Sequence, residues 1–136
     1  MAKGPREMLE FADDVQEALN KGLAEHLTKT QKRLSKANPV DTGRMASSWR
    51  IGKNQPDLSV EPERDGPGDV TTKDYSGKIE YDGQWFVSNN LSYSERVALD
   101  PKWAKGGAGG ANWYRAIETS QVESLKKSMT KFLKQV

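Results

Sequence analysis

The most regular pattern in the sequence is a repeat of apolar or small residues every three or four positions between Glu7 and Lys36. This spacing places the repeat along one face of an α-helix, with charged side chains on the other faces. Pro39 ends the pattern, because proline lacks an amide donor and disfavours helix in the residue before it. We predict a helix over residues 7–36. At about 45 Å it is long for a small domain, so we expect part of it to pack on a neighbouring subunit. The repeat consists of Met8, Ala12, Val15, Leu19, Leu23, Leu27, Thr30 and Leu34.

The central part of the chain carries strand patterns separated by a long polar segment. Residues 48–53 place Trp49 and Ile51 on one side and predict a strand. Residues 54–76 are rich in proline, glycine and charge and predict a long loop, with a short strand near residues 58–60. Two strand-like runs, 78–81 and 84–89, flank Asp82-Gly83, which is a strong hairpin signal.

The C-terminal part predicts further helices. Residues 93–99 form a short candidate helix, and Gly106–Gly110 has the composition of a flexible connector. From about Ala111 a second helical repeat begins, which predicts a helix over residues 111–135. The sequence therefore predicts a single α+β domain over residues 1–136, with a β-rich core over 47–99, a small antiparallel sheet and a C-terminal helix. The second repeat consists of Tyr114, Ile117, Gln121, Leu125, Met129 and Phe132.

Composition limits the classes of protein that the chain can belong to. Hydrophobic residues make up 35% and charged residues 29% of the 136 positions, which is globular but leaves much polar surface. The absence of cysteine excludes disulfides and thiolate metal sites. No run approaches the roughly 20 apolar residues that span a bilayer, and the N-terminus lacks the apolar run of a secretory signal. We expect a protein without a membrane partner that is made in the cytoplasm.

Candidate catalytic motifs are weak. Asp41-Thr42-Gly43 matches the aspartic protease tripeptide, but it follows a long helix and precedes Arg44, whereas the protease site ends a buried apolar strand. His26 is the only histidine and lies within the first helix, where a packing or surface role is far more common than metal ligation. Gly106–Gly110 lacks the Gly-Lys-Ser or Gly-Lys-Thr of a phosphate-binding loop. We expect that the protein is not an enzyme and that it binds no metal and no cofactor.

Nucleic-acid binding is a more serious alternative. Net charge is only +2, so DNA binding would be local and sensitive to salt. The tryptophans that could stack on bases fall mainly on apolar sides of their segments, which favours core positions. Two basic clusters remain, one near the end of each long helix. They are Lys29, Lys32, Arg33 and Lys36, and Lys126, Lys127, Lys131 and Lys134.

Two blocks of sequence resemble the neck or tail-completion (head–tail joining) proteins of long-tailed bacteriophages. The first is Asn38–Trp49, read as NPVDTGRMASSW, which follows a long N-terminal helix as in that family. The second is Val87–Val97, read as VSNNLSYSERV, which is similar to the family's strand, Asn-Asn, tyrosine and short helix. Ala98-Leu99-Asp100 departs from the acidic residue, aromatic and glycine that usually follow.

The resemblance implies a structural virion protein at the head–tail junction, present in the host cytoplasm during assembly. It implies a ring homo-oligomer with six-fold or related symmetry that contacts neck, head-closure and tail-tube proteins and lets DNA pass through its lumen. A tail terminator capping the tail tube is the alternative within this class, and a DNA-binding packaging accessory protein is the alternative outside it.

The first block has two interpretations. Pro39 stops the helix, Asp41 or Thr42 can cap the next turn, and Gly43 permits a tight bend, so the corner could serve only to hold the fold. Alternatively, Arg44 or Arg50 reaches a neighbouring subunit. We predict a subunit interface formed by Asp41, Arg44, Arg50, Tyr93 and Arg96, and we expect residues 54–76 and 106–110 to be mobile in the free chain and to order on partners.

Overall fold

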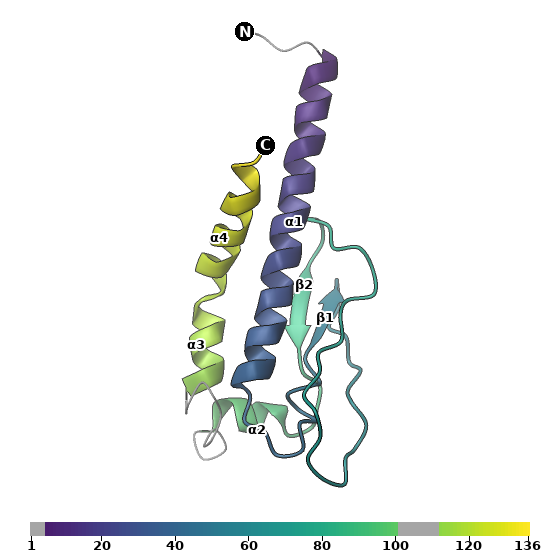
Figure 1. The fold of residues 1–136 in the computed structure, drawn as a ribbon, viewed down its shortest axis with the longest axis vertical. Coiled ribbons are helices and arrows are strands. Elements are labelled where there is room, and N and C mark those ends of the chain that lie inside the picture. Colours follow the sequence, from purple (N-terminus) through teal and green to yellow (C-terminus); the bar gives the residue numbers. More distant parts are fainter. Residues whose placement is uncertain (1–4, 101–111) are drawn as a thin grey trace.

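A computed structural model describes residues 5–100 and 112–136, with side chains described from residue 7 onward. The fold is α+β, as predicted (Figure 1). The long N-terminal helix is one residue longer at its C-terminal end, and two at its N-terminal end, than the pattern predicts. The predicted connector at Gly106–Gly110 lies outside the described residues. In chain order the elements are α1 (Pro5–Ala37), β1 (Arg50–Lys53), β2 (Trp85–Ser88), α2 (Ser94–Leu99), α3 (Trp113–Thr119) and α4 (Gln121–Leu133).

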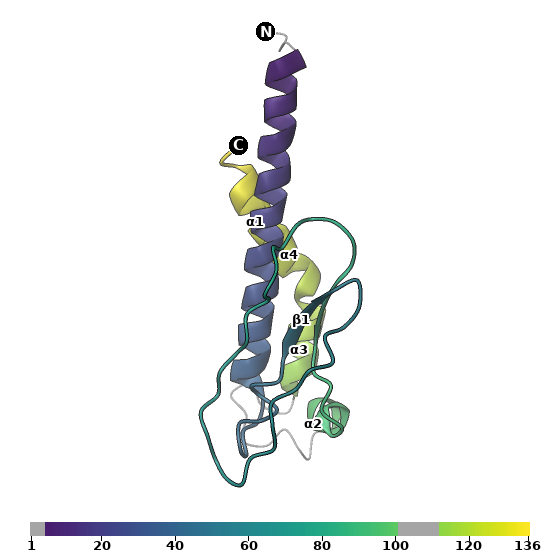
Figure 2. The ribbon, with the colours of Figure 1, turned by 90° about the vertical axis from the view of Figure 1, so that its right-hand side faces the viewer.

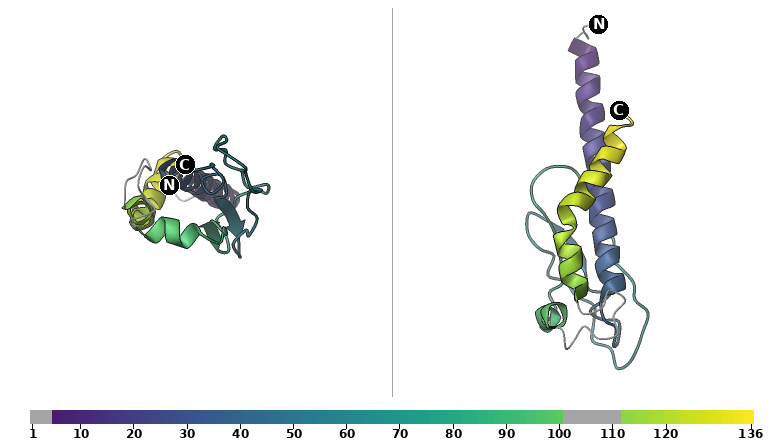
Figure 3. Two further views of the ribbon diagram at one scale, coloured as in Figure 1. Left: turned by 90° about the horizontal axis from the view of Figure 1, so that it is seen from below. Right: turned by 90° about the vertical axis from the view of Figure 1, so that its left-hand side faces the viewer.

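Helix α1 is the central rod of the molecule, and the other elements are arranged around its C-terminal two thirds (Figures 1 and 2). Helices α3 and α4 run antiparallel to α1 along one side, and both contact it. The two strands and the long loop cover the other side, and α2 crosses the end of the rod near Ala37 (Figure 3). Within the part of the chain that the structure describes, no helix is both long and apolar enough to cross a membrane.

The core consists of two clusters that follow one another along α1. The larger one lies near the end of α1, where Trp49 and Trp113 pack edge to face with their ring centroids 6.2 Å apart and Tyr114 stacks on Trp49 at 6.3 Å. The second joins Leu23 and Leu27 of α1 to Ile51 of β1, with Leu125 and Met129 of α4 packed against it. Trp49 and Trp113 are thus core residues, as their positions in the sequence predicted.

The sheet is antiparallel, but its pairing differs from the predicted hairpin. Strand β2 pairs with β1 in a register that places Val87 opposite Ile51, and residues 78–81 form no strand. The indole of Trp85 donates to the carbonyls of Glu80 and Asp82 at 3.0 and 2.9 Å, and the backbone N–H of Tyr81 donates to Asn20 Oδ1 of α1. These bonds fold the segment back on α1, so the local Asp-Gly turn signal is overridden by long-range pairing. The strand expected near residues 58–60 is also absent.

The predicted C-terminal helix is divided at Ser120 into α3 and α4. The hydroxyl of Ser120 donates to the carbonyl of Ile117 at 2.8 Å, and Gln121 Nε2 donates to the same carbonyl at 3.0 Å. Side chains that compete in this way for helix carbonyls interrupt the regular bonding of the backbone. The apolar repeat nevertheless faces α1 on both sides of the break, with Ile117 buried and Leu125 and Met129 packed against the second cluster.

The repeat of apolar or small residues along α1 is buried only in its C-terminal half. Ala18 is the first buried residue of α1, and none of residues 7–17 is buried. The first turns of this N-terminal part extend beyond the end of α4 (Figure 1). Farther along, α1 and α4 approach closely at Gly22, where a Cβ would lie 2.9 Å from Met129 Cα.

Candidate interface at the end of the long helix

The first sequence block forms the corner where α1 ends. The backbone N–H of Asn38 still donates to the carbonyl of Leu34 at 3.0 Å, as in the last turn of a helix. The Asn38 side chain is buried and links the corner to the core, because its Oδ1 accepts from Trp49 Nε1 at 3.1 Å. Pro39 then ends the helix. Asn38 is therefore a structural residue that holds the helix end against the larger cluster.

A single helical turn follows. Thr42 Oγ1 accepts from the backbone N–H of Arg44 at 3.2 Å, and the N–H of Ser47 donates to the carbonyl of Gly43 at 3.0 Å. Thr42 thus provides the predicted cap. Gly43 has φ +85°, a left-handed conformation, and a Cβ there would lie 2.8 Å from Arg64 Nη1 and 2.9 Å from the carbonyl of Gly68. Only glycine adopts the left-handed conformation without strain and leaves room for Arg64 and Gly68.

Two buried serines attach the long loop to this turn. Ser47 Oγ accepts from the N–H of Thr71, and Ser48 Oγ accepts from the N–H of Glu61, both at 3.0 Å. Gln31 of α1 adds a third attachment, since its Nε2 donates to the carbonyls of Trp49 and Lys73, both at 2.8 Å. These bonds anchor the loop over residues 61–73, and they argue against the predicted mobility of that part of residues 54–76 in the free chain.

Arg50 lies inside this network and is only 3% exposed. Its guanidinium donates to the carbonyl of Ser47 at 2.7 Å and to Ser59 Oγ at 3.1 Å, and it lies 3.7 Å from the carboxylate of Glu61. The N–H of Ser59 also donates to Asp57, and this hydrogen bond lowers the pKa of the Asp57 carboxyl. A buried cation with these partners stabilises its own chain, so the prediction that Arg50 lies at a subunit interface is wrong.

The second sequence block packs directly on the first. Asn89 Nδ2 donates to the carbonyl of Met45 at 2.8 Å, and Asn89 Oδ1 accepts from the N–H of Leu91 at 3.2 Å. The carbonyl of Asn89 accepts from the hydroxyl of Ser94 at the start of α2. Asn89 therefore fixes the path from β2 into α2 and joins it to the corner after α1.

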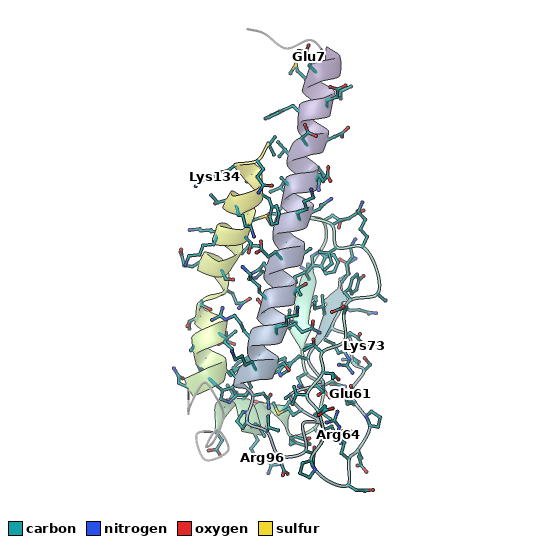
Figure 4. All side chains as sticks on the ribbon, viewed as in Figure 1. Glu7, Glu61, Arg64, Lys73, Arg96 and Lys134 are labelled. Carbon is teal, nitrogen blue, oxygen red and sulfur yellow. The ribbon has the colours of Figure 1, made fainter. Side chains whose placement is uncertain are left out.

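Between the two blocks lies an open hollow of about 650 Å³. Its walls are the corner residues 39–46, the loop residues 63–65, and Tyr93, Arg96 and Val97 from the second block. Arg64 and Arg96 lie at the end of the molecule opposite Glu7 (Figure 4). Three arginines and three carboxylates line the hollow, so it presents mixed charge around the exposed apolar side chain of Val40. The charged residues are Arg44, Arg64, Arg96, Asp41, Glu63 and Asp65.

Four of the five predicted interface residues meet in this hollow: Asp41, Arg44, Tyr93 and Arg96. Arg44 also serves the fold, because its Nε donates to the carbonyl of Glu61 at 2.8 Å. No pattern in the sequence indicates the contribution of Arg64, whose Nη1 donates to the carbonyls of Thr42 and Asp69 at 2.9 and 2.8 Å. Its place depends on the return of the loop through Gly66–Gly68, which no local pattern predicts.

Asp41 and His26, the residues of the weak catalytic and metal-binding motifs, lie in surroundings that differ from those of such sites. Asp41 lies in an exposed bend after α1 and not at the end of a strand. His26 is buried, with its Nδ1 3.1 Å from Ser124 Oγ of α4, and burial lowers the pKa of its imidazole. His26 is therefore a packing residue between α1 and α4.

Comparisons with protein-family models, with curated proteins and with solved structures found no match to this chain.

Proposed function

We propose that the chain is a structural subunit of a bacteriophage neck, a tail-completion or connector protein whose copies form a ring that joins the tail to the head. The observation that carries the proposal is that the two blocks resembling this family, far apart in the sequence, line one hollow at one end of the molecule. Both blocks contain more than packing residues, since Asp41 and Arg96 lie on the surface there.

The hollow suits a protein partner better than a small substrate. It is open, and its lining combines three arginines and three carboxylates with the apolar side chain of Val40, which is 57% exposed. Mixed charge around an apolar centre is the usual make-up of a non-obligate protein interface. In the proposed neck this end of the subunit docks on a head-closure or tail-tube protein, and the protein is located at the head–tail junction of the virion.

Localisation tests the function directly. Antibody-gold labelling of intact and disrupted particles of the source phage should place the label at the head–tail junction. Label absent from particles, with the protein present in infected cells, would refute the neck function. It would favour a DNA-binding accessory protein, which the basic residues of α1 and α4 also support.

Genetic complementation tests the hollow. In a phage lacking the native gene, Arg96→Glu should leave free tails and unjoined heads while the purified variant stays folded, because Arg96 is exposed on α2 and interactions of exposed charges contribute little to stability. Arg115→Glu is the matched control, since Arg115 is exposed on α3 and pairs with Glu118. Arg44→Gln should lower both complementation and the melting temperature, because its Nε bonds to the loop. Full complementation by Arg96→Glu would exclude the hollow as the docking site.

A further inference from the structure

Charge is strongly segregated along the molecule. Residues 7–17 of α1, here called the acidic tip, contain five acidic and no basic side chains. Residues 21–37 and 113–136, which form the packed pair of helices, together contain ten basic and three acidic side chains. The net charge of +2 for the whole chain therefore conceals two surfaces of opposite sign.

Two residues from each of the two basic clusters of the sequence line one groove. A groove of about 490 Å³ lies between α1 and α4 and is lined by Lys29 and Arg33 from α1 and by Lys127 and Lys131 from α4. Glu25 is its central carboxylate, accepting from Lys29 at 2.9 Å and from Lys131 at 3.1 Å. These two lysines lower the pKa of Glu25. The groove is lined by four basic side chains and by two carboxylates, Glu25 and Glu123, which leaves surplus positive charge in this surface, here called the basic groove.

The acidic tip has no core of its own. None of its residues is buried, although Met8 is 58% and Leu9 69% exposed. Its first turns project past the end of α4 (Figure 1), while Asp14 and Glu17 line a hollow with Phe132 at that end. A helix this short gains most of its stability from packing of an apolar face, and exposed apolar side chains rimmed by charge mark interaction sites. The tip therefore has the composition of one half of a contact.

We propose that the acidic tip of one subunit docks in the basic groove of the next, in a head-to-tail contact between copies of this chain. The two surfaces complement each other in charge, since the tip contains five acidic side chains and the groove is lined by four basic ones. A contact between two different surfaces of the same chain produces a ring when its rotation closes. This inference rests on the proposed ring function and names the surfaces that build the ring.

Nucleic acid fits the groove less well. The groove is lined by four basic residues with Glu25 and Glu123 among them, so it has a surplus of only two positive charges, whereas a duplex presents a continuous row of phosphates. DNA would also leave Met8 and Leu9 in water, whereas a second copy covers both surfaces at once. The strong field that non-specific DNA binding requires is reduced by the acidic tip of the same chain.

Charge reversal with mixing tests the contact. The tip variant carries Asp13→Lys, Asp14→Lys and Glu17→Lys, which change the net charge of the tip from −5 to +1. The groove variant carries Arg33→Glu and Lys127→Glu. The control carries Lys73→Glu and Lys78→Glu in the segment between β1 and β2, where Lys73 lies on the other side of α1 from α4 (Figure 4). Sedimentation velocity at low salt should show concentration-dependent association of the natural chain and the control, weaker at high salt. Each reversed variant alone should remain monomeric. A mixture of the tip and groove variants should associate again, because every contact between them then joins opposite charges.

The outcomes are decisive for the contact. A natural chain that stays monomeric at every salt concentration overturns it, as does loss of association by both variants without restoration in the mixture. Unchanged self-association with weakened binding of duplex DNA by the groove variant overturns it in favour of a nucleic-acid surface. Circular dichroism checks that the helices persist. Leu9→Ser, at a side chain 69% exposed, provides a second tip variant that leaves the charge unchanged and should also weaken association. Gold labelling of particles tests the neck function separately.

Discussion

Replacing Gly22 by alanine should destabilise the protein, although the same change in an exposed helix would stabilise it. Glycine inside a helix costs about 0.5–1 kcal/mol relative to alanine, so helix propensity alone favours Gly22→Ala. At this position, however, a Cβ would lie 2.9 Å from both Cα and Sδ of Met129. Carbon atoms make ordinary contact at about 3.5–4.0 Å, so α1 and α4 would have to separate by roughly 0.6 Å or more.

The two effects can be compared. Inserting a methyl group into a well-packed contact costs about 1–3 kcal/mol, which exceeds the gain in propensity. The displaced atom is backbone, so Met129 cannot avoid the methyl group by changing its rotamer. Separation of the helices would also loosen the packing of Leu23, Leu27 and Leu125 in the second cluster. We expect a net loss of about 1–2 kcal/mol in the free energy of unfolding, or roughly 3–8 °C in the melting temperature.

Thermal and urea denaturation of Gly22→Ala would measure this loss. Gly66→Ala is the matched control, because nothing lies within 4 Å of a Cβ placed at Gly66, and it should change stability little. A Gly22→Ala protein as stable as the natural chain, or more stable, would refute the close approach of α1 and α4. Truncation of Met129 to alanine should not rescue the variant, since its Cα and N remain in place.

Three further predictions concern the corner, the buried histidine and the loop. Gly43→Ala should lower the free energy of unfolding, measured by urea titration, by at least about 1–2 kcal/mol, because the left-handed conformation costs that much for a residue with a side chain. The carbonyl of Gly68 also crowds the added methyl group. An unchanged midpoint of unfolding would contradict the observed turn. Burial lowers the pKa of His26 below its ordinary 6.5, so the unfolded chain takes up a proton more readily than the folded protein. The free energy of unfolding should therefore fall as the pH drops through about 6.5 toward the lower pKa of the folded state. His26→Gln should flatten this dependence of the melting temperature, and an equal slope in both proteins would refute the assignment. Hydrogen exchange should show that the amides of Glu61 and Thr71 are protected, because each donates to a buried serine. Ser48→Ala should remove the protection of the Glu61 amide only. Fast exchange of both amides in the natural chain would instead support a mobile loop.

The sequence predicts those parts of the fold that depend on short-range pattern. The long helix, its end before Pro39, the turn capped by Thr42 and the short helix α2 all follow from residues within about one helical turn of each other. The hairpin at Asp82-Gly83 failed for a physical reason. Its turn signal is local, whereas the pairing of β2 with β1 is set by packing of Ile51 and Val87 against α1, which lies far away in sequence.

The candidate site was predictable only in part. The resemblance of two blocks selected Asp41, Arg44, Tyr93 and Arg96, and the structure brings all four to one hollow. Arg50 was also predicted at the interface, because the pattern around the first residue of a strand does not show that Ser47, Ser59 and Glu61 enclose it. The apolar repeat of α1 likewise continues unchanged through its exposed and its buried halves, so the pattern could not show where packing begins.

The positions of the hollow and the acidic tip at opposite ends of the molecule suit a subunit with two kinds of neighbour. Helix α1 has 33 residues and is about 50 Å long, and perturbations at sites more than about 10 Å apart with no shared partner are nearly additive. Contact at one end therefore leaves the other end unchanged. In the proposed neck, the tip and groove would join copies around the ring, while the hollow would bind the axial partner. The close contact at Gly22 and the network around Arg50 would hold the hollow and the tip in a fixed relative orientation. The contacts around the ring and the contact with the axial partner would then keep a constant geometry, as a subunit that joins two parts of a particle requires.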